Sequence, residues 1–375
     1  MSVTDRYIIR EMNEKLVLRT IIQRDTISRA EISKETQLNK ATVSSIVAGL
    51  LQRGLIVELG EGSSSGGRKP ILVCFNHRAA IALAVDLQPD RFSYLFTFLN
   101  GEVLLENTLP KPSLNSHIIF TTLVGEIGKH LPNLPLTKYG LIGMTLAIHG
   151  IIDHEEMIFS PFYDFDTLAL RETLQQYFNI PVYLENEANL AALGETQFST
   201  PSSNLIAINI KYGIGAGIIL DNELYRGANG FAGEVGHMIT VPGGRPCPCG
   251  NHGCMEQYAS EFHTLKHYLP AKEPGPAGIR QLLQDYQVQK PNAVKAIDDF
   301  TANLALGVNN LLTAFNPSVI VINSRLLDQP EIMKLLKSKL NYRINGRTMI
   351  KNSTLKDRAT LLGGIQVAHI NFLGI

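Results

Sequence analysis

Apolar segments of strand length alternate with amphipathic segments of helix length from residue 79 onward. Three strands in succession open this region, helices and strands then alternate, and a second series of strands begins near residue 204. This order predicts a duplicated α/β region whose sheets are covered on both faces. Ligands of such folds bind at strand ends and in the cleft between lobes. The expected strands are 80–87, 91–99, 101–109, 139–147, 181–186, 204–210, 213–227 and, as the last one, 318–323; the expected helices are 118–131, 168–179, 187–198 and 292–315.

The first part of the chain has a pattern typical of a helix-turn-helix. Apolar residues at helical spacing predict a first helix over 5–24. Ser28 is followed three residues later by Glu31, a capping box that opens a short second helix. After a tight turn, a third helix is expected over 40–52, closed by Gly54. The residues expected to form the core of this helix pair are Ala30, Ile32, Leu38, Val43, Ile46, Val47 and Leu50.

A basic hairpin is expected after these helices. Two strands, 55–59 and 71–75, are joined by a glycine- and serine-rich segment that carries Arg68 and Lys69. Hydroxyls and a lysine at the start of the third helix suit a major groove, and a basic hairpin tip suits a minor groove. The segment therefore predicts a DNA-binding winged helix, although helix pairs also serve packing alone and such Ser/Gly runs also serve as linkers. The candidate DNA contacts are Ser28, Arg29, Asn39, Lys40, Thr42, Ser44, Ser45, Arg68 and Lys69.

Charge and hydropathy limit the setting in which this chain works. The formal net charge is zero, yet residues 1–70 hold eleven Lys/Arg against eight Asp/Glu, so the first segment is mildly basic. No run approaches the ~20 apolar residues of a membrane helix. The N-terminal residues lack the apolar core of a secretion signal. We therefore expect a cytoplasmic protein without membrane insertion.

Three of the four cysteines lie in one short stretch, "RPCPCGNHGCME", residues 245–256. In a cytoplasmic protein, clustered cysteines indicate a metal site more than disulfides. His237 lies ten residues before the first of them and completes a Cys₃His set, which zinc binds tetrahedrally as a closed structural site. Gly250 and Gly253 allow the loop to fold back on itself. His252 is a competing ligand, and free thiols in a loop are the other alternative.

Five motifs, taken in order, point to a family. They are "SSGGRKP" after the winged helix, "ENEANLAALGE", "GIGAGIIL", "GANGFAGEVGHM" and "CPCGNHGCME". Together they resemble the ROK family of repressors and sugar kinases, and the junction "SSGGRKPILVCFN" with "ENEAN" is most similar to its xylose-repressor branch. The resemblance implies a winged helix-turn-helix (α+β) over 1–76. It implies that 77–375 form a duplicated α/β, actin-like, ROK sugar-kinase-type domain with two lobes and a structural zinc loop at 237–256.

The resemblance also implies particular roles for residues. The family places its metal on the histidine of "GEVGH", so one structural zinc per chain is expected on His237, Cys247, Cys249 and Cys254. In the family, carboxylates beside this metal face the sugar. The expected sugar-binding residues are Asn186, Glu187, Glu234, His237 and Glu256; the alternative for the first two is capping of a helix. His149 stands where the family has a Pro-Gly pair, so it either contacts the ligand or is structural. "SPFYD" at 160–164 replaces a Ser-Pro-Asn, which leaves the sugar's identity open.

The family includes kinases, and the nucleotide motifs bear on which activity this chain has. Where family kinases have an Asp-x-Gly-Gly-Thr phosphate loop, this chain keeps Asp86 but has Gln88, Pro89 and Asp90. Proline lacks an amide donor, and a second carboxylate repels phosphate. Tyr212 replaces a small hydroxyl residue, and "VINSRLL" lacks the Gly-Gly that accepts adenosine. These losses outweigh the retained Glu187 carboxylate, which could still act as a general base.

We therefore expect a protein that is not an enzyme but a sugar-responsive transcriptional repressor of carbohydrate catabolism genes. Its expected partners are operator DNA, a small sugar effector (xylose or another monosaccharide) and a second copy of the chain in a homodimer or higher homo-oligomer. The alternatives are an ATP-dependent sugar kinase with an added DNA-binding domain and a regulator that docks on a membrane transporter.

Overall fold

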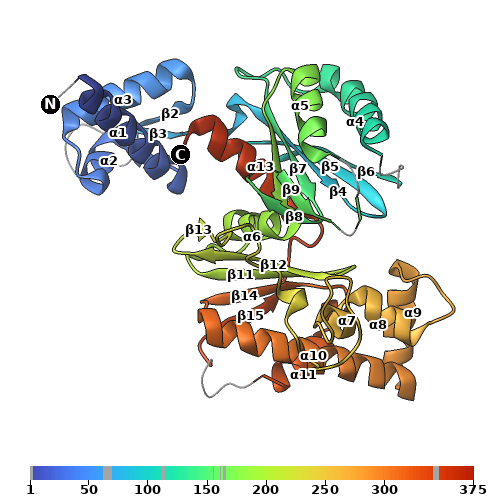
Figure 1. Cartoon of the computed structure of the whole chain (residues 1–375). Helices are drawn as coiled ribbons and strands as arrows, with labels where there is room; N and C mark the ends of the chain where they lie inside the picture. The colour runs from blue at the N-terminus through green and yellow to red at the C-terminus, as the bar shows by residue number, and fades with distance from the viewer. Residues whose placement is uncertain are drawn as a thin grey trace.

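A computed structural model describes residues 3–61, 70–110, 115–154, 156–160, 162–163, 166–340 and 346–375. A small N-terminal domain is followed by two lobes, each built on a five-stranded sheet (Figure 1). The chain enters the second lobe after helix α6 (Glu187–Phe198) and returns to the first with its last helix, α13 (Arg358–Leu373) (Figure 1). Within the described ranges, no helix combines the length and the apolar character needed to span a bilayer.

The N-terminal domain is a winged helix, and its helix ends follow the expected signals. Ser28 Oγ accepts a hydrogen bond from the Glu31 amide at 3.3 Å, and the Glu31 carboxylate accepts one from the Ser28 amide at 2.8 Å. Gly54 ends the third helix at a φ of 68°, a left-handed conformation that favours glycine. The tip of the expected basic hairpin, with Arg68 and Lys69, lies outside the described residues. The elements are α1 (Val3–Gln23), β1 (Ile27–Ser28), α2 (Arg29–Thr36), α3 (Lys40–Arg53), β2 (Ile56–Glu61) and β3 (Ile71–Phe75).

One expectation for this domain is incorrect, and one short strand was not predicted. Ala30 is exposed instead of belonging to the core. It lies two residues before the fully buried Ile32 and therefore points to another side of α2. In addition, the short strand β1 pairs with β3 in antiparallel fashion, with Ile27 opposite Val73. Two residues are too few to give a periodic signal in the sequence.

The two lobes repeat one topology, which confirms the expected duplication. In each sheet, three antiparallel strands form a meander, and two further strands are added in parallel beside its first strand. The strand orders are β6-β5-β4-β7-β10 and β13-β12-β11-β14-β15. The strands are β4 (Ile81–Leu87), β5 (Arg91–Phe98), β6 (Val103–Pro110), β7 (Leu141–Ile148), β10 (Val182–Asn186), β11 (Leu205–Ile210), β12 (Ile214–Leu220), β13 (Glu223–Leu224), β14 (Val319–Asn323) and β15 (Met349–Asn352), with a separate hairpin of β8 (Ile151–Asp153) and β9 (Glu156–Phe159).

The sequence suggested that the strand at 318–323 is the last one, but in the structure another strand follows β14. The edge strand β15 follows it and pairs with it in parallel, with Ile350 opposite Ile320. Of the four residues of β15, only Ile350 is buried. A segment this short, with one buried position, lacks the alternation that identifies a strand in a sequence.

Helices α6 and α13 fill the space between the sheets. α13 packs on β4 and β7, α6 packs on β11 and β12, and the two helices pack on each other (Figure 1). Glycine permits their close approach, since a Cβ on Gly363 would lie 1.7 Å from the Leu190 carbonyl oxygen. Other helices cover the outer faces of the sheets. The first lobe has α4 (Ser116–His130) and α5 (Thr167–Phe178); the second has α7 (Glu256–Ala259), α8 (Glu261–Tyr268), α9 (Pro276–Gln287), α10 (Pro291–Phe315) and α11 (Pro330–Ser338).

Helix α13 also connects the two-lobed domain to the winged helix. Leu373, at its end, belongs to the winged-helix core, and Phe372 and Ile375 pack beside it. Tyr139, which precedes β7, donates a hydrogen bond from its hydroxyl to the Arg53 carbonyl oxygen at 2.7 Å. The helix that packs between the lobes therefore ends inside the core of the N-terminal domain.

Candidate functional site

A cavity of about 390 Å³ opens between the lobes, beside the ends of β7, β10 and β11. Aromatic and aliphatic side chains line it together with carboxylates, imidazoles and two lysines, a mixture that is common in small-molecule sites. The fold brings together in this one cavity the residues that the sequence assigned to sugar binding. They are Asn186, Glu187, Glu234, His237 and Glu256.

Asn186 ends β10 and caps helix α6. Its Oδ1 accepts hydrogen bonds from the amides of Ala188 at 2.8 Å and Asn189 at 3.1 Å. Its Nδ2 donates to the Gly150 carbonyl oxygen at 2.9 Å. The side chain thus fixes the start of α6, where Glu187 is the first residue. Its expected contact with a sugar stays a prediction, and the second Nδ2 hydrogen would have to make it.

The carboxyl groups of Glu187 and Glu234 lie in surroundings that disfavour their charge. Burial raises the pKa of Glu187, and this effect is opposed by His149 and reinforced by Asp86. Burial, with the nearby charges of Glu187 and Glu256, raises the pKa of Glu234 to about 7. Near neutral pH the Glu234 carboxyl group therefore holds its proton for part of the time, and it both donates and accepts hydrogen bonds. The cavity therefore suits a neutral ligand that carries many hydroxyl groups.

His149, whose role the sequence left open, forms a buried ion pair at this cavity. Its Nε2 lies 2.8 Å from Oδ1 of Asp86, and the two residues are 8% and 0% exposed. Burial lowers the pKa of His149, but the charges of Asp86 and Glu187 outweigh burial and leave this pKa raised. The sequence analysis did not connect the two residues, because they are 63 positions apart. No local signal links them, because they meet only in the folded sheet, where Asp86 of β4 lies opposite Ala147 of β7, two residues before His149.

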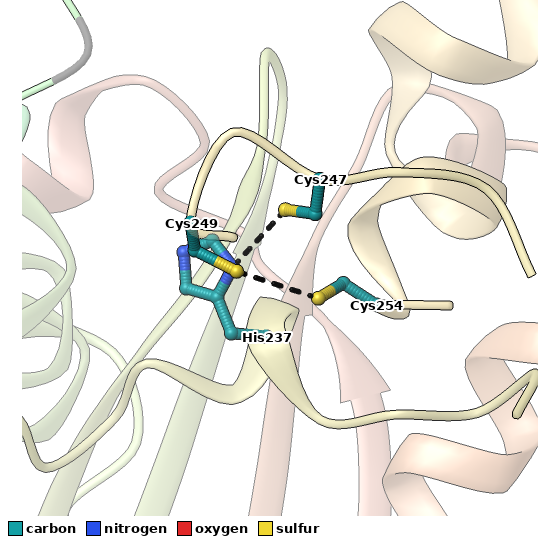
Figure 2. A group of neighbouring side chains, drawn as sticks. All are labelled: His237, Cys247, Cys249 and Cys254. Carbon is teal, nitrogen blue, oxygen red and sulfur yellow. Dashed lines mark hydrogen bonds between the residues drawn. The ribbon is translucent and has the colours of Figure 1, made fainter. Parts of the chain in front are cut away.

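The four predicted metal ligands meet in one place (Figure 2), and two of them, His237 and Cys249, also line the cavity. One donor atom from each lies within 4.8 Å of the other three, and this set could hold a metal ion. Cys249 Sγ lies 3.6 Å from Cys254 Sγ, and Cys247 Sγ lies 3.5 Å from His237 Nδ1 (Figure 2). A tetrahedral zinc ion with ordinary bond lengths holds such pairs ~3.6–3.8 Å apart. His252, the competing ligand, is exposed and lies outside this group.

Two carboxylates that line the cavity lie next to the predicted metal ligands. Glu234 Oε2 lies 3.7 Å from Nε2 of His237, one of the four metal ligands. Glu256 Oε1 lies 3.1 Å from the sulfur of Cys247, another ligand. Glu234 lies three residues before the ligand His237 and Glu256 two residues after the ligand Cys254, so an ion that fixes these ligands also limits the movement of both carboxylates.

A smaller cavity of about 140 Å³ lies beside the first, and Lys211 and Tyr212 line both. The loop after β4 borders this smaller cavity. Its cations lie beside carboxylates: Arg91 lies 2.7 Å from Asp90, whereas Lys211 and Arg325 share Asp357 at 2.9 Å and 3.6 Å. Burial and a hydrogen bond to Asp90 raise the pKa of Tyr212. This hydrogen bond links the second lobe, which carries Tyr212, to the first. Lys211 and Tyr212 thus lie at the boundary between the two cavities.

The predicted DNA-binding residues divide into helix caps and exposed positions. Ser28 is 4% exposed, and its hydroxyl is committed to the cap of α2. Asn39 caps α3 by accepting a hydrogen bond from the Thr42 amide at 2.8 Å. Arg29 lies 3.2 Å from Glu58 of the wing strand β2. The exposed predicted residues on the first turns of α3 are Lys40, Ser44 and Ser45.

Comparison with known proteins identifies relatives over the whole chain. The xylose repressor of Bacillus subtilis (strain 168) is 33% identical over 381 residues, which cover 100% of this chain and 99% of the relative. The xylose repressor of Caldicellulosiruptor bescii is 35% identical over 391 residues, 98% of this chain and 97% of the relative. The N-acetylglucosamine repressor of Escherichia coli O6:H1 is 26% identical over 338 residues, 87% of this chain and 83% of the relative.

Solved structures and family profiles agree with this fold. A crystal structure of a ROK family transcriptional regulator, a homologue of the E. coli Mlc protein, has a TM-score of 0.80 at 24% identity and covers 98% of this chain and 97% of that one. A ROK glucokinase from Streptomyces griseus with glucose and AMPPNP has a TM-score of 0.66 at 22% identity and covers 76% of this chain and 98% of that one. The MarR family profile matches residues 11–69, and the ROK family profile matches residues 82–370. The chain belongs to the ROK family.

Proposed function

We propose that this chain is a sugar-responsive transcriptional repressor of carbohydrate catabolism genes. The observation that carries the proposal is the connection, through the single helix α13, of a winged helix to a cavity lined by carboxylates and imidazoles. Relatives named xylose repressors match the full length of the chain, which supports xylose as the first effector to test, with another monosaccharide as the alternative. We place the protein in the cytoplasm as a homodimer, whose two α3 helices would read the halves of a palindromic operator.

The start of α3 is the proposed reading surface. Lys40, Ser44 and Ser45 are exposed there, and the helix N-terminus adds amide groups that attract phosphate. The basic tip with Arg68 and Lys69 would contact the neighbouring minor groove. Ser28 and Asn39 would support this surface through their caps and main chains.

We infer that the metal is one structural zinc ion per chain. Three thiolates and one imidazole are the donor set of closed structural zinc sites, and the observed separations of the donor atoms fit a tetrahedral ion. Zinc in such a site supplies a rigid cross-link and takes no part in a reaction. The residues of this chain that would gain from that rigidity are Glu234 and Glu256.

Helix contacts offer a route from the cavity to the DNA-binding domain. Glu187, at the cavity, begins α6, and its carbonyl oxygen accepts a hydrogen bond from Thr360 of α13 at 3.3 Å. Lys211, also at the cavity, pairs with Asp357 directly before α13. The other end of α13, at Leu373, lies in the winged-helix core. A sugar that favours one arrangement of the lobes would therefore reposition the winged helices and lower their affinity for DNA.

An ATP-dependent sugar kinase is the alternative, because Glu187 stands where family kinases carry their general base. Phosphoryl transfer depends on placing the nucleotide. Here Gln88, Pro89 and Asp90 occupy the first phosphate loop, and Tyr212 stands in the second in place of a small hydroxyl residue. A coupled assay with ATP and a panel of sugars separates the two functions, since turnover of about 1 s⁻¹ or faster would support the kinase.

A thermal-shift screen tests the proposed function first. Pentoses, hexoses, amino sugars and their phosphates are added in turn to the purified protein. A ligand that binds the native state raises the melting temperature through mass action. We expect a neutral monosaccharide, xylose first, to give the largest rise. No rise with any sugar of the panel would contradict the proposal.

A further inference from the structure

His149 is held in place from three directions at the cavity. Its Nε2 is bound to Asp86, whose second oxygen, Oδ2, is buried and has no hydrogen-bond partner among the described residues. Its amide donates a hydrogen bond to the Tyr163 hydroxyl at 3.0 Å. Its carbonyl oxygen accepts one from Ser160 Oγ at 2.8 Å. A side chain fixed in this way presents its remaining nitrogen at one defined point.

That remaining nitrogen faces a carboxylate across a gap. Nδ1 of His149 lies 4.0 Å from Oε1 of Glu187, and both residues line the cavity. The separation is too long for a direct hydrogen bond. In the described part of the chain, no other side chain donates a hydrogen bond to Glu187 Oε1 or bonds to His149 Nδ1. Both atoms are therefore free to bind a ligand.

The gap has the dimensions of a single oxygen atom. An oxygen about 2.8 Å from each of two atoms that are 4.0 Å apart subtends an angle of about 90° between them, which suits a hydroxyl group that both donates and accepts. Resting on the proposed function, we propose that His149 Nδ1 and Glu187 Oε1 together bind one hydroxyl group of the effector sugar. His149 is thereby a residue that determines which sugar is recognised. Asp86 acts through His149 as a positioning residue.

Calorimetric titration with sugars that lack one hydroxyl group tests this inference. The probes are D-xylose, D-glucose and N-acetyl-D-glucosamine, followed by the monodeoxy analogues of the one that binds the wild-type chain. The variants are His149→Leu, which keeps a similar volume without the nitrogens, and Asp86→Asn. His117→Leu is the matched control, because His117 is exposed on α4. Melting temperature and metal content verify that each variant is folded.

The expected result is a specific coupling between one hydroxyl and one side chain. In the wild type, one deoxy analogue should bind about 10- to 100-fold more weakly than the parent sugar, since a hydrogen bond to a charged group is lost. The His149→Leu variant should bind the parent sugar more weakly than the wild type does, by a similar factor. It should bind this analogue and the parent sugar with equal affinity. In the His149→Leu background, Asp86→Asn should cause no further loss, whereas a merely structural role would give an additive loss.

The outcomes separate this inference from the proposed function. A wild-type chain that binds neither these sugars nor any other sugar of the thermal-shift panel would overturn both. A wild-type chain that binds a sugar, beside a His149→Leu variant that binds it with unchanged affinity, would overturn this inference alone. A His149→Leu variant whose affinity falls by the same factor for every deoxy analogue would also overturn this inference alone. In that case the hydroxyl group would be recognised elsewhere.

Discussion

The imidazole of His369 stacks on the ring of Phe75, with centroids 5.4 Å apart and planes inclined by 24°. His369 belongs to α13 and Phe75 to the last strand of the winged helix, so the stack joins the two domains. His369 is 4% exposed, and neither ring nitrogen has a hydrogen-bond partner among the described residues. Burial lowers its pKa from 6.5 to about 4.

This histidine should make folding stability depend on pH. The folded pKa is lower than the unfolded pKa, so the unfolded chain binds the extra proton between about pH 6.5 and pH 4. The free energy of unfolding is therefore unaffected by this group above pH 6.5. It decreases by about 3 kcal/mol as the pH falls from 6.5 toward 4. We expect His369→Leu to lose less free energy of unfolding than the wild type between pH 7 and pH 4.5 in urea titrations. Parallel pH profiles for the two proteins would contradict this assignment, and His117→Leu serves as the control.

The contact between α6 and α13 should tolerate no side chain at Gly363. Gly363→Ala would place a Cβ 1.7 Å from the Leu190 carbonyl oxygen, so the helices must separate. We expect a loss of about 1–3 kcal/mol in the free energy of unfolding and a weaker effect of sugar on DNA binding. Gly125→Ala on α4 is the matched control, because nothing lies within 4 Å of its Cβ position. That change should be neutral or stabilising by up to ~1 kcal/mol. Equal effects of the two substitutions would refute the role given to this contact.

Some of this structure follows from local signals in the sequence, and some does not. The capping box of Ser28 and Glu31 and the stop at Gly54 depend on neighbouring residues, so the helices of the N-terminal domain were predictable. The cysteine spacing likewise restricts the metal ligands to a few candidates. The pairing of His149 with Asp86 depends on two strands that meet only in the folded sheet.

Helix α13 was not predicted from the sequence either, and the reason is again that its contacts form only in the folded protein. Its apolar residues pack on the first-lobe sheet, on α6 and on the winged helix, so no single face is apolar and the helix carries no periodic pattern. The edge strand β15 has one buried residue and leaves no mark either. Contacts between segments distant in the chain are therefore what the sequence alone did not reveal.

Loss of one metal ligand should weaken sugar binding and folding together. Cys249→Ser removes a thiolate of the group, and we expect elemental analysis to find clearly less than one zinc per chain, with a lower melting temperature. Sugar affinity should fall by about 10- to 100-fold, because Glu234 and Glu256 would no longer be fixed. Cys74→Ser is the control, since Cys74 is a free thiol on β3, outside the group. A full zinc content and unchanged sugar affinity in Cys249→Ser would show that the four residues do not form the site.

The exposed start of α3 should contribute electrostatic binding to DNA. Lys40→Ala should weaken DNA binding and reduce the slope of log K against log salt by about one, the amount expected for one lost phosphate contact. Lys334→Ala removes an exposed lysine on α11 of the second lobe and should leave the slope unchanged. The measurement is a fluorescence anisotropy titration over a series of salt concentrations. Identical slopes for Lys40→Ala and the wild type would exclude Lys40 from the DNA-binding surface.

The most direct test is the affinity of the intact protein for DNA with and without sugar. A duplex selected by the protein from a random-sequence library is titrated by fluorescence anisotropy at saturating concentrations of the sugar that gives the largest thermal shift. The account predicts that the sugar raises the Kd for this duplex by about 5- to 150-fold, and that the duplex weakens sugar binding by the same factor. A Kd for DNA that is unchanged by a sugar shown to be bound would contradict it.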